Sequence, residues 1–211
     1  IEKGCRKRIS MPKIITAVPG GITEVERRAI VNAISSFGVR SVYLIETPKA
    51  SAMGAGLDIL SGEGKLVADL GGGTADIAVL SLGGVSSGIS IKKAGNEMDK
   101  NIIKYMKSHY NLSIGQQMAE QCKKEIGAVK FVDADKTFIM KGRDMVSGLP
   151  KAIEVRKSQL IPIYQRTMLE IIRGIVDVLE NTPPELNGDI LKSGIVFTGG
   201  LSKIEGLKEL V

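Results

Sequence analysis

The stretch that decides the fold is Leu66–Ser81, LVADLGGGTADIAVLS, in which two apolar runs flank three glycines. Both runs have the length and composition of buried strands, so the sequence predicts a β-hairpin with Gly71, Gly72 and Gly73 at its turn. Glycine has no Cβ atom and can adopt positive φ. The backbone N–H groups of such a turn can therefore converge on an anion such as a phosphate. The alternative is a tight hairpin whose glycines serve its geometry alone.

Two side chains beside the glycines extend this interpretation. Asp69 directly precedes the turn, and its carboxylate can hold a hydrated Mg²⁺ on a bound phosphate. Thr74 follows the turn and offers a hydroxyl from the far side. The stretch therefore predicts a site for a phosphate together with its metal ion.

Composition narrows the class of protein. With 211 residues, of which 43% are hydrophobic and 25% charged, the chain can bury a core in one or two domains. It has no apolar run of about 18 residues, so no membrane-spanning helix is expected. A net charge of +6, four Phe, four Tyr and no Trp argue against a nucleic-acid-binding module. Cys5 and Cys122 are too few for a disulfide framework and predict free thiols in a reducing compartment, and the lone His109 indicates no catalytic or metal role.

The motif D-L-G-G-G-T with strands on both sides resembles the phosphate loop of the actin-like ATPase superfamily, and in particular that of the MreB family of bacterial actins. Further stretches share this resemblance, namely AVPGGITEVERRAI, GNEMDKNIIKYMKSHYNLSIG and IVFTGG. It extends from about Pro12 to Val211, nearly the whole chain. The resemblance implies the actin-like ATPase fold, an α/β fold of ribonuclease H-like duplicated domains. In that fold mixed sheets are covered by helices, and ATP or ADP with Mg²⁺ binds between two domains.

The resemblance also implies a domain layout. Residues 1–62 would form part of domain I (subdomain IA), residues 63–95 and 155–211 subdomain IIA, and residues 96–154 subdomain IIB. The chain begins without an initiator methionine, ends in what looks like a helix, and lacks the acidic D-x-G-T type turn of the first phosphate loop. We therefore expect a partial chain that carries half of a nucleotide site.

The nucleoside side of the site is predicted on a helix at about 115–126. Glu120, Lys123 and Lys124 are neighbours on the surface of that helix, so a carboxylate and an ammonium can grip a ribose and a purine together. On charge pattern alone, a solvated helix face is the alternative. In the resembled family an acid and a base at this spacing hold the adenosine. Gly95 would lie near the phosphates in the same fold, and Asn96 after it is predicted as the N-cap of a helix.

A second adenosine contact is predicted at the end of a strand over Ile195–Thr198. The glycine pair Gly199 and Gly200 follows it, and glycines at a strand's carboxyl end let the backbone pack close to a flat or anionic ligand. The alternative is a simple turn into a final helix. In the resembled family this is the adenosine-side loop, and Leu201 stands where a third glycine is usual.

The first part of the chain predicts a βαβ unit with a parallel strand pair. The strand over Pro12–Val18 is nearly continuously apolar, as in a strand covered on both faces. A helix follows, with Thr23 and Glu26 as its capping box, and a second strand covers Val42–Ile45.

The stretch IETPKASAMGAG departs from the resembled family at one position. There the residue directly before the proline is a glutamate that positions or activates the attacking water, whereas this chain has Thr47. A threonine hydroxyl is no general base near pH 7, and Glu46 should point away because strand residues alternate between faces. We therefore expect slow ATP hydrolysis, with Thr47 and Thr74 at the catalytic positions. Thr47 as an N-cap before Pro48 is the structural alternative.

The resemblance implies a cytoplasmic, filament-forming bacterial actin for cell shape or motility. It would polymerise with itself, and with other MreB copies, on bound ATP and Mg²⁺ beneath the cell membrane. A basic and apolar segment near the start of the chain can contact an anionic membrane, with a solvated connector as the alternative. Its residues are Arg6, Lys7, Arg8, Ile9 and Met11. A small-molecule kinase and a chaperone-type ATPase are the alternative functions on the same fold.

Overall fold

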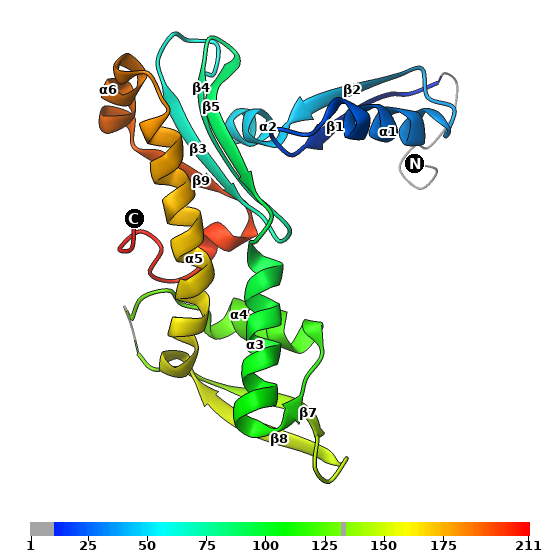
Figure 1. Ribbon diagram of the computed structural model, residues 1–211, viewed down its shortest axis with the longest axis vertical. Coiled ribbons are helices and arrows are strands. Elements are labelled where there is room, and N and C mark those ends of the chain that lie inside the picture. Colours follow the sequence, from blue (N-terminus) through cyan, green and yellow to red (C-terminus); the bar gives the residue numbers. More distant parts are fainter. Residues whose placement is uncertain (1–10, 132–133) are drawn as a thin grey trace.

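The computed structural model describes residues 11–131 and 134–211. The described chain is elongated and has three parts (Figure 1). The first part projects sideways and contains β1 (Lys13–Val18), α1 (Glu24–Ser35), β2 (Ser41–Glu46) and α2 (Thr47–Gly54). The central part contains β3 (Lys65–Leu70), β4 (Ala75–Ser81), β5 (Gly84–Ile91), α6 (Pro184–Ser193), β9 (Ile195–Thr198) and the 3-10 helix η1 (Gly200–Lys203).

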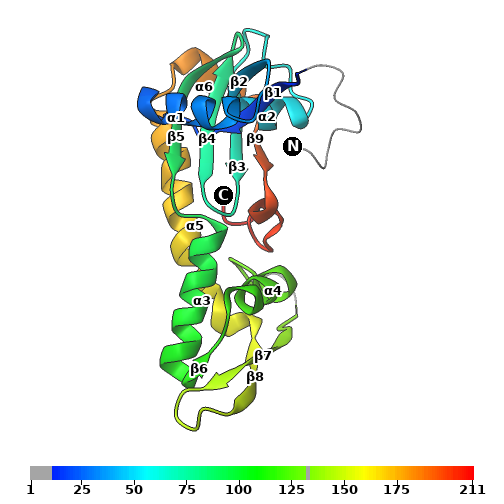
Figure 2. The same ribbon diagram turned by 90° about the vertical axis from the view of Figure 1, so that its right-hand side faces the viewer.

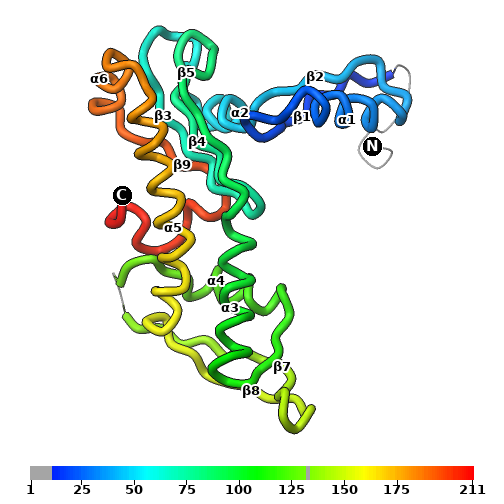
Figure 3. The backbone as a smooth tube through the Cα atoms, in the orientation of Figure 1, coloured from blue at the N-terminus to red at the C-terminus, as the bar shows by residue number. Residues whose placement is uncertain are grey.

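The third part lies at the opposite end of the molecule from α6. It contains β6 (Leu112–Ser113), α4 (Gln116–Ile126), β7 (Thr137–Asp144) and β8 (Pro150–Arg156). Two long helices connect it with the central part: the chain enters through α3 (Gly95–Tyr110) and returns through α5 (Lys157–Glu180), as the backbone trace shows (Figure 3).

The central sheet is mixed and has the strand order β5-β4-β3-β9. Strand β3 is antiparallel to β4 and parallel to β9. Successive residues of β3 enter different cores: Leu66 and Ala68 pack in the large core that includes α5, whereas Val67 packs with Ala52 of α2. Helices therefore cover both faces of β3 and β4, which explains why the Leu66–Ser81 stretch is so continuously apolar. Figure 2 shows α5 behind this sheet.

The first part departs from its expected burial. Strands β1 and β2 are parallel, as predicted, and Thr23 and Glu26 form the expected capping box of α1. The expectation that β1 is covered on both faces is wrong for the part of the chain that the structure describes, because Ile15 remains 72% exposed. Burial alternates along β1, so only one face of this two-stranded sheet is shielded.

Three predicted helix boundaries also differ. Helix α2 begins at Thr47 with Glu46 as its N-cap, so Thr47 itself is not the cap. Helix α3 begins at Gly95, one residue before the expected cap Asn96. After β9 the expected final helix is only the four-residue η1, followed by turns.

No helix among residues 11–131 and 134–211 is long and apolar enough to cross a membrane. Of the predicted membrane-contact segment, residues 6–9 lie outside the described part of the chain, and Met11 is exposed. Membrane contact and a place beneath the membrane therefore stay predictions.

Candidate functional site

The glycine hairpin forms as predicted, between the last pair of β3 and β4, Leu70 and Ala75. Its turn is closed by the Gly71 N–H, which donates to the carbonyl of Thr74 at 3.0 Å. None of the three glycines has positive φ. Space is the requirement at two of them, because a Cβ atom would lie 3.1 Å from the Thr74 carbonyl at Gly71 and 3.1 Å from Asn96 Oδ1 at Gly72, whereas at Gly73 it would meet nothing within 4 Å.

The first turn of α3 is bonded to this hairpin. The N–H of Gly95 donates to the Gly71 carbonyl at 3.2 Å, and the N–H of Asn96 donates to the Gly72 carbonyl at 2.8 Å. Two N–H groups that would otherwise lack partners at the helix start are thereby satisfied. Gly95 must stay small, because a Cβ atom there would be 3.3 Å from both the Gly71 carbonyl and Lys123 Nζ.

A cavity of about 490 Å³ opens beside the hairpin, and this volume suits a small-molecule ligand. The structure brings together seven of the predicted site residues in its wall: Gly71, Gly72, Gly95, Glu120, Lys123, Lys124 and Gly200. Sequence reasoning missed five others, Asn96, Gly127, Leu201, Lys203 and Ile204. The wall is therefore built from the hairpin, the first turn of α3, one face of α4 and the segment around η1.

Lys123 is engaged by the protein itself. Its ammonium lies 2.7 Å from Asp99 Oδ1 and donates to the Gly95 carbonyl at 2.8 Å. Burial raises the pKa of Asp99, and the ammonium beside it counteracts this effect. Lys123 thus ties α4 to the hairpin end of α3. Asp99 was not predicted as a site residue, although an acid among the inward-facing residues of α3 is the signal that could have found it.

Glu120 and Lys124 form the exposed part of the same cavity wall. Their side chains are paired at 2.7 Å across one helical turn, and the Lys124 ammonium lowers the pKa of Glu120. The three predicted residues of α4 therefore have two kinds of contact. Lys123 binds the start of α3, whereas Glu120 and Lys124 bind each other and face solvent.

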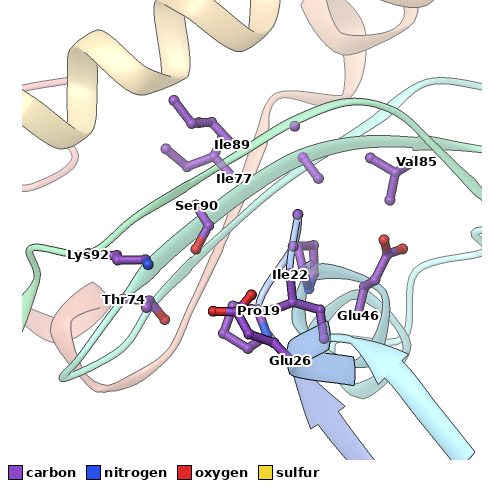
Figure 4. Close-up of a pocket in the computed structure, with 15 residues that line it drawn as sticks. Pro19, Ile22, Glu26, Glu46, Thr74, Ile77, Val85, Ile89, Ser90 and Lys92 are labelled. Atoms are coloured by element: carbon purple, nitrogen blue, oxygen red, sulfur yellow. The ribbon is translucent and has the colours of Figure 1, made fainter. Parts of the chain in front are cut away.

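A second cavity, of about 480 Å³, lies on the other side of the hairpin, toward the first part of the chain (Figure 4). Thr74 lines it, and its hydroxyl donates to Asp76 Oδ2 at 2.8 Å. Asp76 Oδ1 also accepts the Gly20 N–H at 3.3 Å. The buried carboxylate of Asp76, which the sequence analysis did not single out, therefore links the hairpin to the turn after β1.

Thr47 lines neither cavity that contains hairpin residues. Its hydroxyl donates to the Val18 carbonyl at 3.0 Å. Glu46 does line the cavity of about 480 Å³, but its carboxylate pairs with Lys49 at 3.0 Å. Figure 4 shows this carboxylate near Val85, at the other end of the cavity from Thr74. Glu46 and Thr47 thus face different ways, as strand alternation predicts, but Glu46 is the one that faces the cavity shared with Thr74. That Glu46 does not replace a catalytic base at residue 47 stays a prediction.

Asp69, the predicted magnesium ligand, lies at the end of β3 and accepts a hydrogen bond from the Thr198 hydroxyl at 3.0 Å. Gly199 has φ +80°, and a Cβ atom there would overlap the Leu70 carbonyl and crowd the Asp69 carboxylate. Gly199 therefore serves the close approach of β9 to β3, while Gly200 faces the cavity of about 490 Å³. One carboxylate suits Mg²⁺, which usually keeps several waters and takes its other ligands from phosphate oxygens.

Comparisons with known proteins agree with this architecture. Mbl of Bacillus subtilis (strain 168), a cell shape-determining protein, is 42% identical over 203 residues, which are 96% of this chain and 61% of that protein. MreB of Escherichia coli (strain K12), also a cell shape-determining protein, is 37% identical over 95% of this chain and 58% of its own length. The chain thus spans about three fifths of these relatives.

Solved structures show the same relationship. MreB5 of Spiroplasma citri bound to AMPPNP superposes with a TM-score of 0.88 at 39% identity, covering 93% of this chain and 59% of that one. A double helical filament of MamK superposes with a TM-score of 0.81 at 22% identity, covering 99% of this chain and 62% of that one, which shows the fold alone.

The hairpin, the mixed sheet and these superpositions define the class: the chain has the actin-like fold, as predicted. The family model for the MreB/Mbl protein matches residues 1–211. The chain belongs to the MreB/Mbl family.

The buried thiol on α4 generates a chemical prediction. Cys122 is fully buried beneath the cavity wall, and burial raises its pKa to about 12. The thiolate is the reactive form, and the raised pKa leaves this thiol almost entirely un-ionised at pH 8. In a Cys5→Ser background we expect iodoacetamide to label Cys122 only after denaturant is added, as measured by mass spectrometry. Rapid labelling of the folded protein would contradict this placement of α4.

Proposed function

We propose that this chain binds an adenine nucleotide with its phosphates on the glycine hairpin and its nucleoside in the cavity of about 490 Å³. One observation carries the proposal: the hairpin turn and the cavity adjoin, because Gly71 and Gly72 belong to the turn and also line the cavity. The pair of Glu120 and Lys124 supplies polar groups for a ribose. Crystal structures of the related MreB5 of Spiroplasma citri with AMPPNP and with ADP support this choice of ligand.

Magnesium is part of the proposal. Asp69 would hold the ion, which when bound would neutralise phosphate charge. Thr198 fixes the orientation of the Asp69 carboxylate through its hydroxyl. The chain itself thus contributes one oriented acid to this part of the proposal.

A substitution at Gly95 tests nucleotide binding. In Gly95→Val the side chain would press on the Gly71 carbonyl and on Lys123 Nζ, so the hairpin and the cavity wall would move apart. We expect the affinity for ATP with Mg²⁺, measured by calorimetry on the full-length protein, to fall by about tenfold or more. Gly115→Val is the matched control at the start of α4, where a Cβ atom meets nothing within 4 Å. Unchanged ATP affinity in Gly95→Val would contradict the proposed site.

We further propose that hydrolysis of the bound nucleotide is slow. The Thr47 hydroxyl is occupied by the Val18 carbonyl, and the Glu46 carboxylate is paired with Lys49. A threonine hydroxyl is no general base, and the Glu46 carboxylate lies at the other end of the cavity from Thr74, so neither group is placed to take a proton from a water beside Thr74. A positioned general base typically contributes about 10²–10⁴-fold to a rate, which sets the scale of the expected deficit.

Restoring a carboxylate tests this explanation. Thr47→Glu should raise the rate of phosphate release by about 10²-fold, whereas Thr47→Gln, of the same size but with no basic group, should not raise it. The rate is followed with a coupled phosphate assay at saturating ATP. Equal rates in the two variants would show that the missing base does not limit hydrolysis.

The fold also supports a proposal of self-assembly into filaments, as in the related MamK filament. Large apolar side chains are exposed at both ends of the elongated molecule. Val146, 83% exposed, lies in the β7–β8 turn at one end, and Leu191, 89% exposed, lies on α6 at the other (Figure 1). The β7–β8 turn is held rigid, because Asp144 accepts the N–H groups of Val146 and Ser147 at 2.9 Å each. Contacts between unlike ends repeat without closing, which produces a filament.

Electron microscopy of the full-length protein with ATP and Mg²⁺ tests this proposal. Val146→Asp places a charge in the proposed contact and should raise the critical concentration for filaments by about tenfold or more. Val25→Asp, on the exposed surface of α1 away from both ends, is the matched control. Filaments that form equally well in the two variants would exclude the β7–β8 turn from the contact, and no filaments in the unsubstituted protein would contradict self-assembly itself.

A further inference from the structure

An ion pair between a buried lysine and a partly exposed glutamate lies behind the wall of the nucleoside cavity. Lys157, the first residue of α5, has a fully buried side chain. Its ammonium is 2.7 Å from Oε1 and 2.9 Å from Oε2 of Glu205, and the ring of Phe131 lies 5.9 Å away. An ammonium buried without a partner is strongly unfavourable, so Lys157 holds Glu205 in place.

The backbone of Glu205 is joined to the segment that follows α4. Its N–H donates to the Gly127 carbonyl at 3.3 Å, and its carbonyl accepts the Val129 N–H at 2.8 Å. Ala128 and Glu205 thereby form a parallel bridge. Gln165 of α5 donates to the Val129 carbonyl at 2.8 Å, so α5 holds both segments. Helix α5 thus contacts both segments, Glu205 through Lys157 and Val129 through Gln165.

Both joined segments supply residues to the cavity of about 490 Å³. Gly127 lines it from the end of α4, and Ile204, the neighbour of Glu205, lines it from the segment after η1. In Figure 1 this last segment of the chain runs between the central sheet and α4. The side chains of Lys157 and Glu205 are themselves absent from the cavity lining.

We propose that Lys157 and Glu205 are positioning residues that set the distance between these two walls, and thereby the affinity for the nucleoside half of the ligand. This inference rests on the proposed nucleotide site. The phosphate half is held separately, because the hairpin is fixed by the bonds from Gly95 and Asn96. Loss of the ion pair should therefore weaken binding of the nucleoside and spare binding of the phosphates. A purely structural role would weaken both.

The test compares two ligands on one variant. Glu205→Gln leaves the Lys157 ammonium buried without a counter-charge, so the segment after η1 should shift away from Gly127. We expect the dissociation constant for Mg²⁺-ATP, measured with a fluorescent ATP analogue, to rise by about tenfold, while inorganic tripolyphosphate with Mg²⁺ competes as well as before. Glu209→Gln removes the same charge from an exposed position on the same segment and should change neither value.

A second variant covers the case in which Glu205→Gln does not fold. Replacing both charges, in Lys157→Met with Glu205→Met, leaves no buried charge, and such replacements are often tolerated. This protein should fold and still show the selective loss of ATP affinity. Unchanged ATP affinity, or an equal loss for ATP and tripolyphosphate, would overturn the inference. Absence of ATP binding, or of competition by tripolyphosphate, in the unsubstituted protein would instead overturn the proposed nucleotide site.

Discussion

The rest of the site depends on two backbone hydrogen bonds that hold the glycine hairpin against the start of α3. The N–H groups of Gly95 and Asn96 donate them to the carbonyls of Gly71 and Gly72. They join the turn of a buried hairpin to the start of a helix that leads into another part of the molecule. Such bonds need the two backbones to approach closely, and glycine at three of the four positions allows it. A displacement of the hairpin must therefore be transmitted to α3, because breaking these bonds would leave polar backbone groups without partners.

The hairpin also separates two cavities that face different neighbours. One is shared with α4 and the segment after η1, and the other with the turn after β1. Asp76 connects the hairpin to that turn through the Thr74 hydroxyl and the Gly20 N–H. The turn is therefore bonded directly to α3, which leads into the third part, and is linked through Asp76 to the first part of the chain. A ligand that contacts the turn would bias the arrangement of both parts, provided that it binds one arrangement better than another.

This turn could be predicted from the sequence because a turn of this geometry needs particular residue types at particular positions. Three glycines between two apolar runs, and a glycine at the start of α3, are local signals. The contacts of individual side chains could not be predicted in the same way. Lys123 and Lys124 are adjacent in the sequence and are the same residue type, yet only Lys123 contacts Asp99 and the Gly95 carbonyl. Likewise, the near-continuous apolar residues of β1 predicted a strand covered on both faces, whereas the described neighbours shield only one. Such distinctions depend on which distant segments pack nearby, and periodicity carries no information about that.

The ion pairs around the cavity of about 490 Å³ differ in burial and in the elements that they join. Lys123 is bound by Asp99 and Lys157 by Glu205, while the more exposed Lys124 pairs with Glu120 on the rim. Buried ion pairs add little net stability, because desolvation offsets the attraction, but they hold their partners in one arrangement. The pair of Asp99 and Lys123 joins the neighbouring helices α3 and α4, whereas Lys157 and Glu205, 48 residues apart, join α5 with the segment after η1. Lys123 lines the cavity, whereas Lys157 and Glu205 lie outside its lining, so part of the wall is positioned by charges that a ligand does not need to contact.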